Sequence, residues 1–237
     1  MIDTIKYNWT IILVCVIISV VVGIIIFEEV AFPSEQASTQ GSQIPQVQGE
    51  QENRDDISFA IAPGDYYRGN RDAKIVFIEY SDLECPYCKR FHSTMKQVID
   101  GYGDHVLWAY RHFPLGSHPN AQKASEAAEC VGKYSGDNAF WEFTDLYFSR
   151  TTSNGYGFPT ANLAALATEV GADQGTIQGC IDSGEMVESV ASDFQAGIDS
   201  GVTGTPGTIL IEPDGKSQVL SGAIPYEQMK KIIESSL

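Results

Sequence analysis

Positive charge is scarce in this chain of 237 residues. Lys and Arg number 15 against 31 Asp and Glu, which gives a formal net charge of −16. This excess of acid argues against nucleic acid and anionic membrane surfaces as partners. Hydrophobic residues still make up 43% of the chain, enough for the core of one good-sized domain with appendages.

Cysteine is also limited, to five residues and a single Cys-x-x-Cys motif, Cys85-Pro86-Tyr87-Cys88. Because the sequence has no second pair of this kind, a zinc site built from two such pairs is disfavoured. Cys85, Cys88 and His92 could still supply three ligands to a zinc ion. Five cysteines are more than a protein of the reducing cytosol usually carries. We expect surface or core roles for all the histidines: His92, His105, His112 and His118.

The Cys-x-x-Cys motif lies between a predicted strand and a predicted helix. Residues 75–80 are apolar and β-forming apart from Glu79, which predicts a buried strand. Three polar residues end this strand: Ser81, Asp82 and Glu84. Pro86 suits the first helical position, where the missing N–H of proline costs nothing. The helix is predicted to end near residue 101 or 103.

This placement favours thiol chemistry at Cys85. The unpaired N–H groups and the dipole of the first helical turn favour a thiolate there, and such sites have pKa values of roughly 3.5–7.5. We expect Cys85 to meet solvent and Cys88, one turn further on, to be the shielded resolving thiol. A purely structural disulfide is the alternative, but closing so short a loop adds little stability.

The segment YSDLECPYCKRF at residues 80–91 resembles the active-site segment of the DsbA-like thiol–disulfide oxidoreductases of the thioredoxin superfamily. Two further stretches agree in the same order, YRHFPL at 110–115 and GVTGTP at 201–206. The resemblance extends from about residue 65 to the C-terminus. It implies an α/β thioredoxin fold with a helical insertion at about 114–200.

The resemblance also assigns a role to Thr205-Pro206. From base rates alone this bond would be predicted trans. In thioredoxin-like proteins, however, a cis proline lies opposite the Cys-x-x-Cys motif, and the backbone of the residue before it pairs with substrate. Gly207 departs from the β-forming residue usual after this proline, so we expect a looser start to the following strand.

Glu79 matches an acidic position of the family. The implied role is a buried carboxylate with a raised pKa that accepts or relays a proton for Cys88. An acid that faces a solvated pocket or pairs with a lysine is the alternative. The variable dipeptide, Pro86-Tyr87, tunes the redox potential in this family. A tyrosine at this position does not indicate whether that potential is high or low.

Other parts of the chain predict the remaining elements. Residues 65–72 are interpreted as a polar, turn-rich lead-in, and 106–110 as a second buried strand. Helices are predicted at 119–134 (capped by Ser117 or His118), 138–148, 160–170, 173–181, 185–198 and 225–235, and strands at 208–211 and 218–220.

Cys130 and Cys180 lie on two of these helices. A disulfide between them, which varies within the family, would stabilise by up to about 4 kcal/mol, and two buried free thiols are the alternative.

The N-terminal part predicts a membrane anchor. Residues 10–27 are uncharged and about long enough to cross a bilayer, with Lys6 before them, which favours an N-terminus inside. A cleaved signal peptide is the alternative, but no small-x-small site follows at a suitable place. The predicted domains are a cytoplasmic N-terminus at 1–9, the anchor, a flexible linker at 28–56 and the thioredoxin domain at 57–237.

The chain is therefore predicted to be a membrane-tethered oxidoreductase that donates the Cys85–Cys88 disulfide to reduced exported proteins. It would act on the extracytoplasmic side and need no metal or organic cofactor. The resemblance implies reoxidation by a quinone-linked membrane partner of the DsbB or VKOR kind. A reductase or isomerase of the same fold is one alternative, and a non-catalytic or zinc-holding binding module is another.

Overall fold

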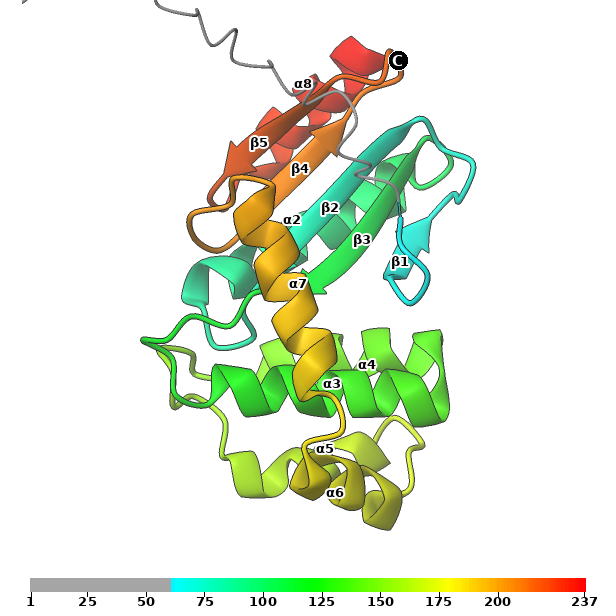
Figure 1. Cartoon of the computed structure of the whole chain (residues 1–237). Coiled ribbons are helices and arrows are strands. Elements are labelled where there is room, and N and C mark those ends of the chain that lie inside the picture. The colour runs from blue at the N-terminus through cyan, green and yellow to red at the C-terminus, as the bar shows by residue number, and fades with distance from the viewer. Residues whose placement is uncertain (1–60) are drawn as a thin grey trace, which may run out of the picture. The chain divides into compact units, whose positions relative to one another are not determined.

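The computed structural model describes residues 61–237. Within this part five strands form one mixed sheet in the order β1-β3-β2-β4-β5, from right to left in Figure 1. The predicted anchor and linker, 10–27 and 28–56, lie outside the described residues. Among the residues that are described, no helix combines the length and the apolar character needed to cross a membrane.

The central strand is β2 (Ile75–Ser81), which pairs in parallel with β3 (Val106–His112) and antiparallel with β4 (Gly207–Ile211). The antiparallel edges are β1 (Tyr66–Gly69) and β5 (Ser217–Ser221). Successive residues of β2 point to opposite faces, so Phe77 lies in the larger core cluster and Ile78 in the smaller. Both faces are therefore packed, which explains the unbroken apolar run in the sequence.

Helices cover both faces of the sheet (Figure 1). On one face lie α2 (Pro86–Tyr102) and α8 (Tyr226–Ser236), and on the other lies α7 (Val187–Asp199). Because α7 contacts β2 and β3 as well as the insertion, the last helix of the predicted insertion also belongs to the thioredoxin core. A Cβ at Gly197 would lie 2.7 Å from the Phe113 ring, so glycine allows α7 its close approach to the sheet.

The insertion is helical, as predicted. Its elements are α3 (Ala121–Ser135), α4 (Asp137–Arg150), a 3-10 turn (Thr160–Asn162), α5 (Leu163–Thr168) and α6 (Gln174–Ser183). Asp173 caps α6 by accepting a hydrogen bond from Thr176 N at 2.8 Å. Cys130 on α3 and Cys180 on α6 form a disulfide, with Cα atoms 6.1 Å apart.

Several local expectations are wrong. Residues 65–72 are not only a polar lead-in, because they contain the strand β1, which pairs with β3. A short edge strand tolerates polar residues, since one side of its backbone needs no partner strand. The N-cap of α3 is Asn120 rather than Ser117 or His118. Gly207 does not loosen β4: the strand begins at this residue, and a Cβ would lie 2.6 Å from Val202.

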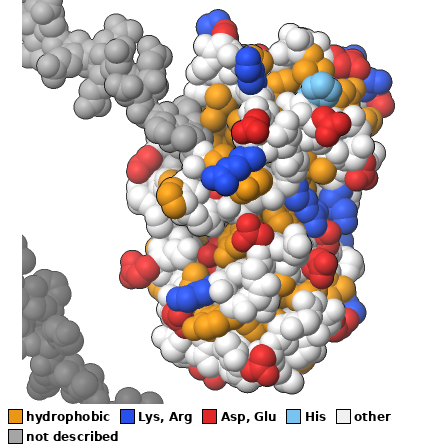
Figure 2. Space-filling view, turned by 90° about the vertical axis from the view of Figure 1, so that its right-hand side faces the viewer, with side chains coloured by type: hydrophobic (Ala, Val, Ile, Leu, Met, Phe, Trp, Pro, Cys, Tyr) orange, Lys and Arg blue, Asp and Glu red, His pale blue; other side chains and the backbone are white. Residues whose placement is uncertain are grey.

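Charge is mixed on the face that Figure 2 shows. Acidic and basic side chains are interspersed there with uncharged ones, and neither sign forms one continuous area. On this face, therefore, neither sign of charge marks out one area.

Candidate active site

Cys85 and Cys88 lie at the N-terminal end of α2. Cys85 is the N-cap residue and Pro86 is the first residue of the helix. Both cysteines are free thiols, and Cys88 is fully buried. Cys85 is only 3% exposed, so its expected open contact with solvent is wrong for the free protein. An attacking thiol therefore needs close docking to reach its sulfur.

The loop before β4 lies against Cys85. The Thr205-Pro206 peptide bond is cis, and Cys85 Sγ is 3.5 Å from the carbonyl oxygen of Thr205. The fold thus brings together a thiol and a backbone carbonyl that are 120 positions apart in the sequence. This arrangement places main-chain groups beside the reactive sulfur, where an extended substrate segment could pair with them.

The two thiols differ in acidity. A hydrogen bond from the Cys88 thiol, followed by contacts with Thr205 and with the N–H groups of Tyr87 and Cys88, lowers the pKa of Cys85 from 9.0 to about 6. At pH 7 about ten Cys85 thiolates are then present for each thiol. Burial raises the pKa of Cys88 well above its ordinary value. The largest single contribution to the low pKa of Cys85 is the Cys88 thiol, and the N–H groups of the helix start that the sequence suggested add to it.

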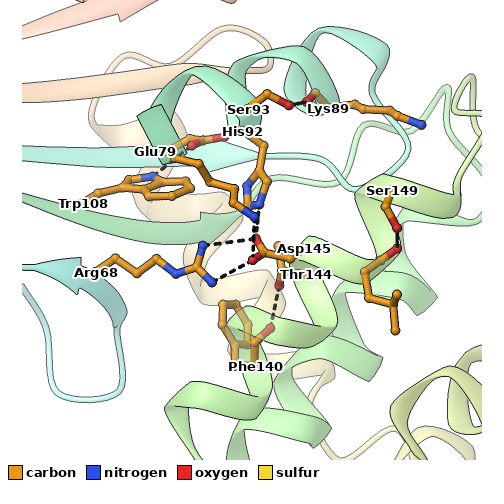
Figure 3. Close-up of polar contacts among 12 residues, drawn as sticks. Arg68, Glu79, Lys89, His92, Ser93, Trp108, Phe140, Thr144, Asp145 and Ser149 are labelled. Atoms are coloured by element: carbon orange, nitrogen blue, oxygen red, sulfur yellow. Dashed lines mark hydrogen bonds and ion pairs between the residues drawn. The ribbon is translucent and has the colours of Figure 1, made fainter. Parts of the chain in front are cut away.

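Glu79 lies inside the protein, on β2. It is fully buried, and its Oε2 accepts a hydrogen bond from Trp108 Nε1 at 3.0 Å (Figure 3). Burial raises the pKa of Glu79 to about 7, against the opposing effect of hydrogen bonding. The site therefore holds a carboxyl group that changes charge near neutral pH, as a proton carrier requires.

Asp82 links the segment before Cys85 to the loop after β3. Its backbone N–H donates to Cys88 Sγ at 3.4 Å, and its buried carboxylate accepts from Leu115 N and His118 Nδ1, both at 2.8 Å. Burial raises the pKa of Asp82, and these hydrogen bonds oppose that rise. Asp82 therefore holds the resolving thiol and the loop in fixed relative positions.

Glu84 links the same segment to the helical insertion. It is fully buried one residue before Cys85. Four donors bind its carboxylate: the hydroxyls of Tyr147 and Thr151 and the N–H groups of Gly157 and Phe158. The carbonyl of Glu84 also accepts from Asn154 N at 2.8 Å. The sequence alone predicts only that Asp82 and Glu84 end a strand.

Tyr87 is the exposed member of the motif. Its side chain is 57% exposed, and the Arg90 guanidinium lies 5.0 Å from the centre of its ring. This pair offers a flat, cationic surface on the first turn of α2, next to the buried thiols.

Asp145 on α4 joins the insertion to α2 and β1 (Figure 3). Arg68 donates to both carboxylate oxygens at 3.1 and 2.9 Å, and His92 Nε2 and Lys96 Nζ lie 2.6 and 3.0 Å away. Although burial acts to raise it, these partners hold the pKa of Asp145 well below its ordinary value. His92 is thereby committed to this contact rather than to the two thiols.

Within residues 61–237, no cluster of three or more His, Cys, Asp or Glu side chains is suited to a metal ion.

Changing Asp145 to Asn is expected to destabilise the protein by about 2 kcal/mol at pH 7, because Arg68 and Lys96 lose their charged partner. A depressed carboxyl pKa stabilises the fold above the unfolded pKa of about 4, and this contribution is lost as pH falls through the folded-state pKa. The difference between the two proteins in urea unfolding should therefore be full at pH 7, begin to shrink at pH 3, which lies between the unfolded and the folded-state pKa, and disappear only at still lower pH. Asp214→Asn, at an exposed pair with Lys216, is the matched control. An equal difference at both pH values would contradict the assignment.

Comparison with known proteins identifies the family. Residues 62–235 match the family described as thioredoxin. The chain belongs to the thioredoxin family. The match covers every strand of the sheet and the helices that carry the two thiols and the insertion.

Solved structures agree with this family. The chain is 28% identical to DsbA2 of Pseudomonas aeruginosa, with a TM-score of 0.63 and coverage of 74% of this chain and 96% of that one. BdbD of Bacillus subtilis shares the fold at 21% identity and a TM-score of 0.63, with coverage of 73% and 92%. Family, fold and dithiol geometry together support a disulfide-exchange function.

Curated relatives are much longer proteins. The chain is 30% identical over 173 residues to the Na(+)/H(+) antiporter NhaA of Herminiimonas arsenicoxydans, with coverage of 73% of this chain and 25% of the relative. A similar match to NhaA 3 of Salinispora tropica, at 31% identity, covers 64% of this chain and 22% of that protein. The chain spans about a quarter of the length of these relatives.

Proposed function

We propose that this chain is a thiol–disulfide oxidoreductase that donates the Cys85–Cys88 disulfide to reduced exported proteins. The observation that carries the proposal is the contrast between the two thiols, an acidic Cys85 at a helix start and a buried, weakly acidic Cys88. A stable Cys85 thiolate favours the reduced enzyme, and this makes the disulfide a good oxidant.

The exchange follows from this geometry. A substrate thiolate attacks Cys85 Sγ, the Cys85–Cys88 bond breaks, and Cys88 leaves with the electron pair. A second substrate thiolate then attacks the substrate sulfur of the mixed disulfide. The substrate disulfide forms, Cys85 leaves as thiolate, and the enzyme is reduced by two electrons. The cis Pro206 loop and the Thr205 carbonyl border the attacked sulfur and orient the incoming chain.

We propose further that residues 10–27 tether the domain to the cytoplasmic membrane, with the thiols on the extracytoplasmic side. The support is the uncharged run in the sequence and the use of five cysteines. A quinone-linked membrane protein of the DsbB or VKOR kind is the proposed reoxidant, because each turnover leaves the enzyme as a dithiol.

The reduction potential of the Cys85–Cys88 pair tests the direction of exchange. Equilibration of the full chain with glutathione should give a reduction potential of about −120 mV, where strong oxidants lie. A value near about −270 mV is typical of a reductase and would reverse the proposed direction. Absence of any redox equilibrium would overturn the proposal and favour a binding module.

A further inference from the structure

A line of buried polar side chains runs under the start of α2. Glu79 and Ser81 lie two residues apart on β2 and therefore point to the same face of the sheet. Glu79 is in register with Tyr110 on β3 and with Thr208 on β4. These four side chains are at most 2% exposed. We call them the buried polar line.

Cys88 lies at one end of this line. The N–H of Asp82, the residue that follows Ser81, donates to Cys88 Sγ at 3.4 Å. The resolving sulfur is therefore beside the end of β2, where Ser81 lies on the Glu79 face and interacts with Cys88. Cys88, on α2, lies beyond the Ser81 end of β2, and Glu79 lies one step further along the strand, with about 7 Å between the Cα atoms of Ser81 and Glu79.

Each member of the buried polar line has hydrogen-bonding capacity that the protein does not use. Four atoms have no hydrogen-bond partner among residues 61–237: Glu79 Oε1, Ser81 Oγ, Tyr110 Oη and Thr208 Oγ1. Buried polar atoms nearly always have partners, so each such group needs an explanation. A hydroxyl can accept one proton and donate another, which a chain of unpaired polar atoms beside a leaving thiolate can use.

We propose that Ser81 relays the proton between Cys88 and Glu79, an inference that rests on the proposed function. When Cys88 leaves as a thiolate, it takes the hydroxyl proton of Ser81, and Ser81 takes the carboxyl proton of Glu79. The products are a neutral Cys88 thiol, an unchanged serine and a Glu79 carboxylate. No electrons move in this step beyond those of the disulfide exchange itself.

The charges of the interior fit this relay. Burial raises the pKa of Cys88 well above its ordinary value, so its thiolate needs a proton as it forms. Burial also raises the pKa of Glu79 to about 7, so that a proton is available near neutral pH. For Cys88, Glu79 and Tyr110 alike, the Ser81 hydroxyl opposes the rise in pKa that burial causes, as expected of a hydroxyl that faces all three.

The test compares Ser81→Ala with the unchanged full chain. The oxidised proteins are mixed with dithiothreitol, and the single-turnover rate of reduction is followed by tryptophan fluorescence from pH 6 to 8.5. The relay needs a protonated Glu79, so the variant should be about tenfold slower at pH 6, and the difference should disappear above pH 8. Tyr110 and His112 on β3 and Cys85 beside α2 also face this region, and both proteins keep them.

Two further variants separate a relay from a structural effect. Ser81→Thr keeps the hydroxyl and should keep the pH-dependent rate. Ser125→Ala removes another fully buried hydroxyl without a partner, on α3 of the insertion, and should react like the unchanged chain.

The outcomes distinguish the relay from the function on which it rests. Equal rates for Ser81→Ala and the unchanged chain at pH 6, or a rate loss that is the same at every pH, would overturn the relay alone. If Ser81→Ala does not fold, Ser81→Thr at the unchanged rate supports the relay, and loss of the pH-dependent component in Ser81→Thr overturns it. No reduction of the unchanged chain by dithiothreitol would remove the proposed function and the relay together.

Discussion

Replacing Cys88 with serine is expected to leave the chain joined to its substrates through Cys85. In this variant the acidic Cys85 thiolate attacks a disulfide of a substrate protein, and one substrate sulfur leaves as thiolate. Without Cys88 no internal thiol can resolve the resulting mixed disulfide. Replacing Cys85 instead should reduce dithiol oxidation by at least about 10³-fold, because the remaining thiol is buried and weakly acidic. These are the largest effects on activity that we expect.

Trapping is measured on the full chain in cells, by non-reducing gels and mass spectrometry of the adducts. The Cys85→Ala/Cys88→Ser double variant is the matched control, because it differs from the trapping variant only at the nucleophile. Adducts that persist in this double variant would show that another cysteine reacts. A Cys88→Ser protein without adducts, in cells that export cysteine-containing proteins, would contradict the assignment of Cys85.

Changing Glu84 to Ala is expected to destabilise the protein by about 4 kcal/mol. The change leaves four donors without an acceptor in a buried place: the Tyr147 and Thr151 hydroxyls and the Gly157 and Phe158 N–H groups. Each unpaired buried donor lowers the free energy of unfolding by about 1–3 kcal/mol. The loss is smaller than four such costs added together, because the surrounding structure relaxes in part.

Urea unfolding at pH 7 measures this loss, with the slope as a check on two-state behaviour. Glu169→Ala is the control: that glutamate binds Arg150 on the surface, where both side chains are 44% exposed, and its loss should change stability by less than about 1 kcal/mol. A Glu84→Ala protein as stable as this control would mean that the four donors find other partners.

The strand, motif and helix at residues 75–102 could be predicted because local signals agree there. The apolar run, the polar break and Pro86 all indicate the same boundaries, and β2 and α2 begin and end close to them. The edge strand β1 could not be predicted in this way. Residues 66–69 form β1 through backbone pairing with β3, a contact made some 40 positions away that leaves no apolar pattern in the strand itself.

Glu79 could be singled out in the sequence, whereas Asp82 and Glu84 could not. A lone acid inside an apolar run stands out, but acids in a polar loop normally face solvent. The donors that satisfy Glu84 lie 63 to 74 positions further along the chain, so only the folded insertion shows that this loop is buried. The cause of the low Cys85 pKa was partly missed for the same reason, since the contact with the Cys88 thiol depends on side-chain placement.

Under the proposed function, the Cys130–Cys180 bond makes each newly made copy of this protein a substrate of older, oxidised copies. A newly made chain has two pairs of cysteines to oxidise, and the pair inside the insertion closes a loop with a sequence separation of 50. Under the proposed function, mature copies carry the oxidant for that bond. Maturation of this protein is then autocatalytic: its rate rises with the amount of oxidised protein already present, and a cell that starts without any matures its first copies slowest.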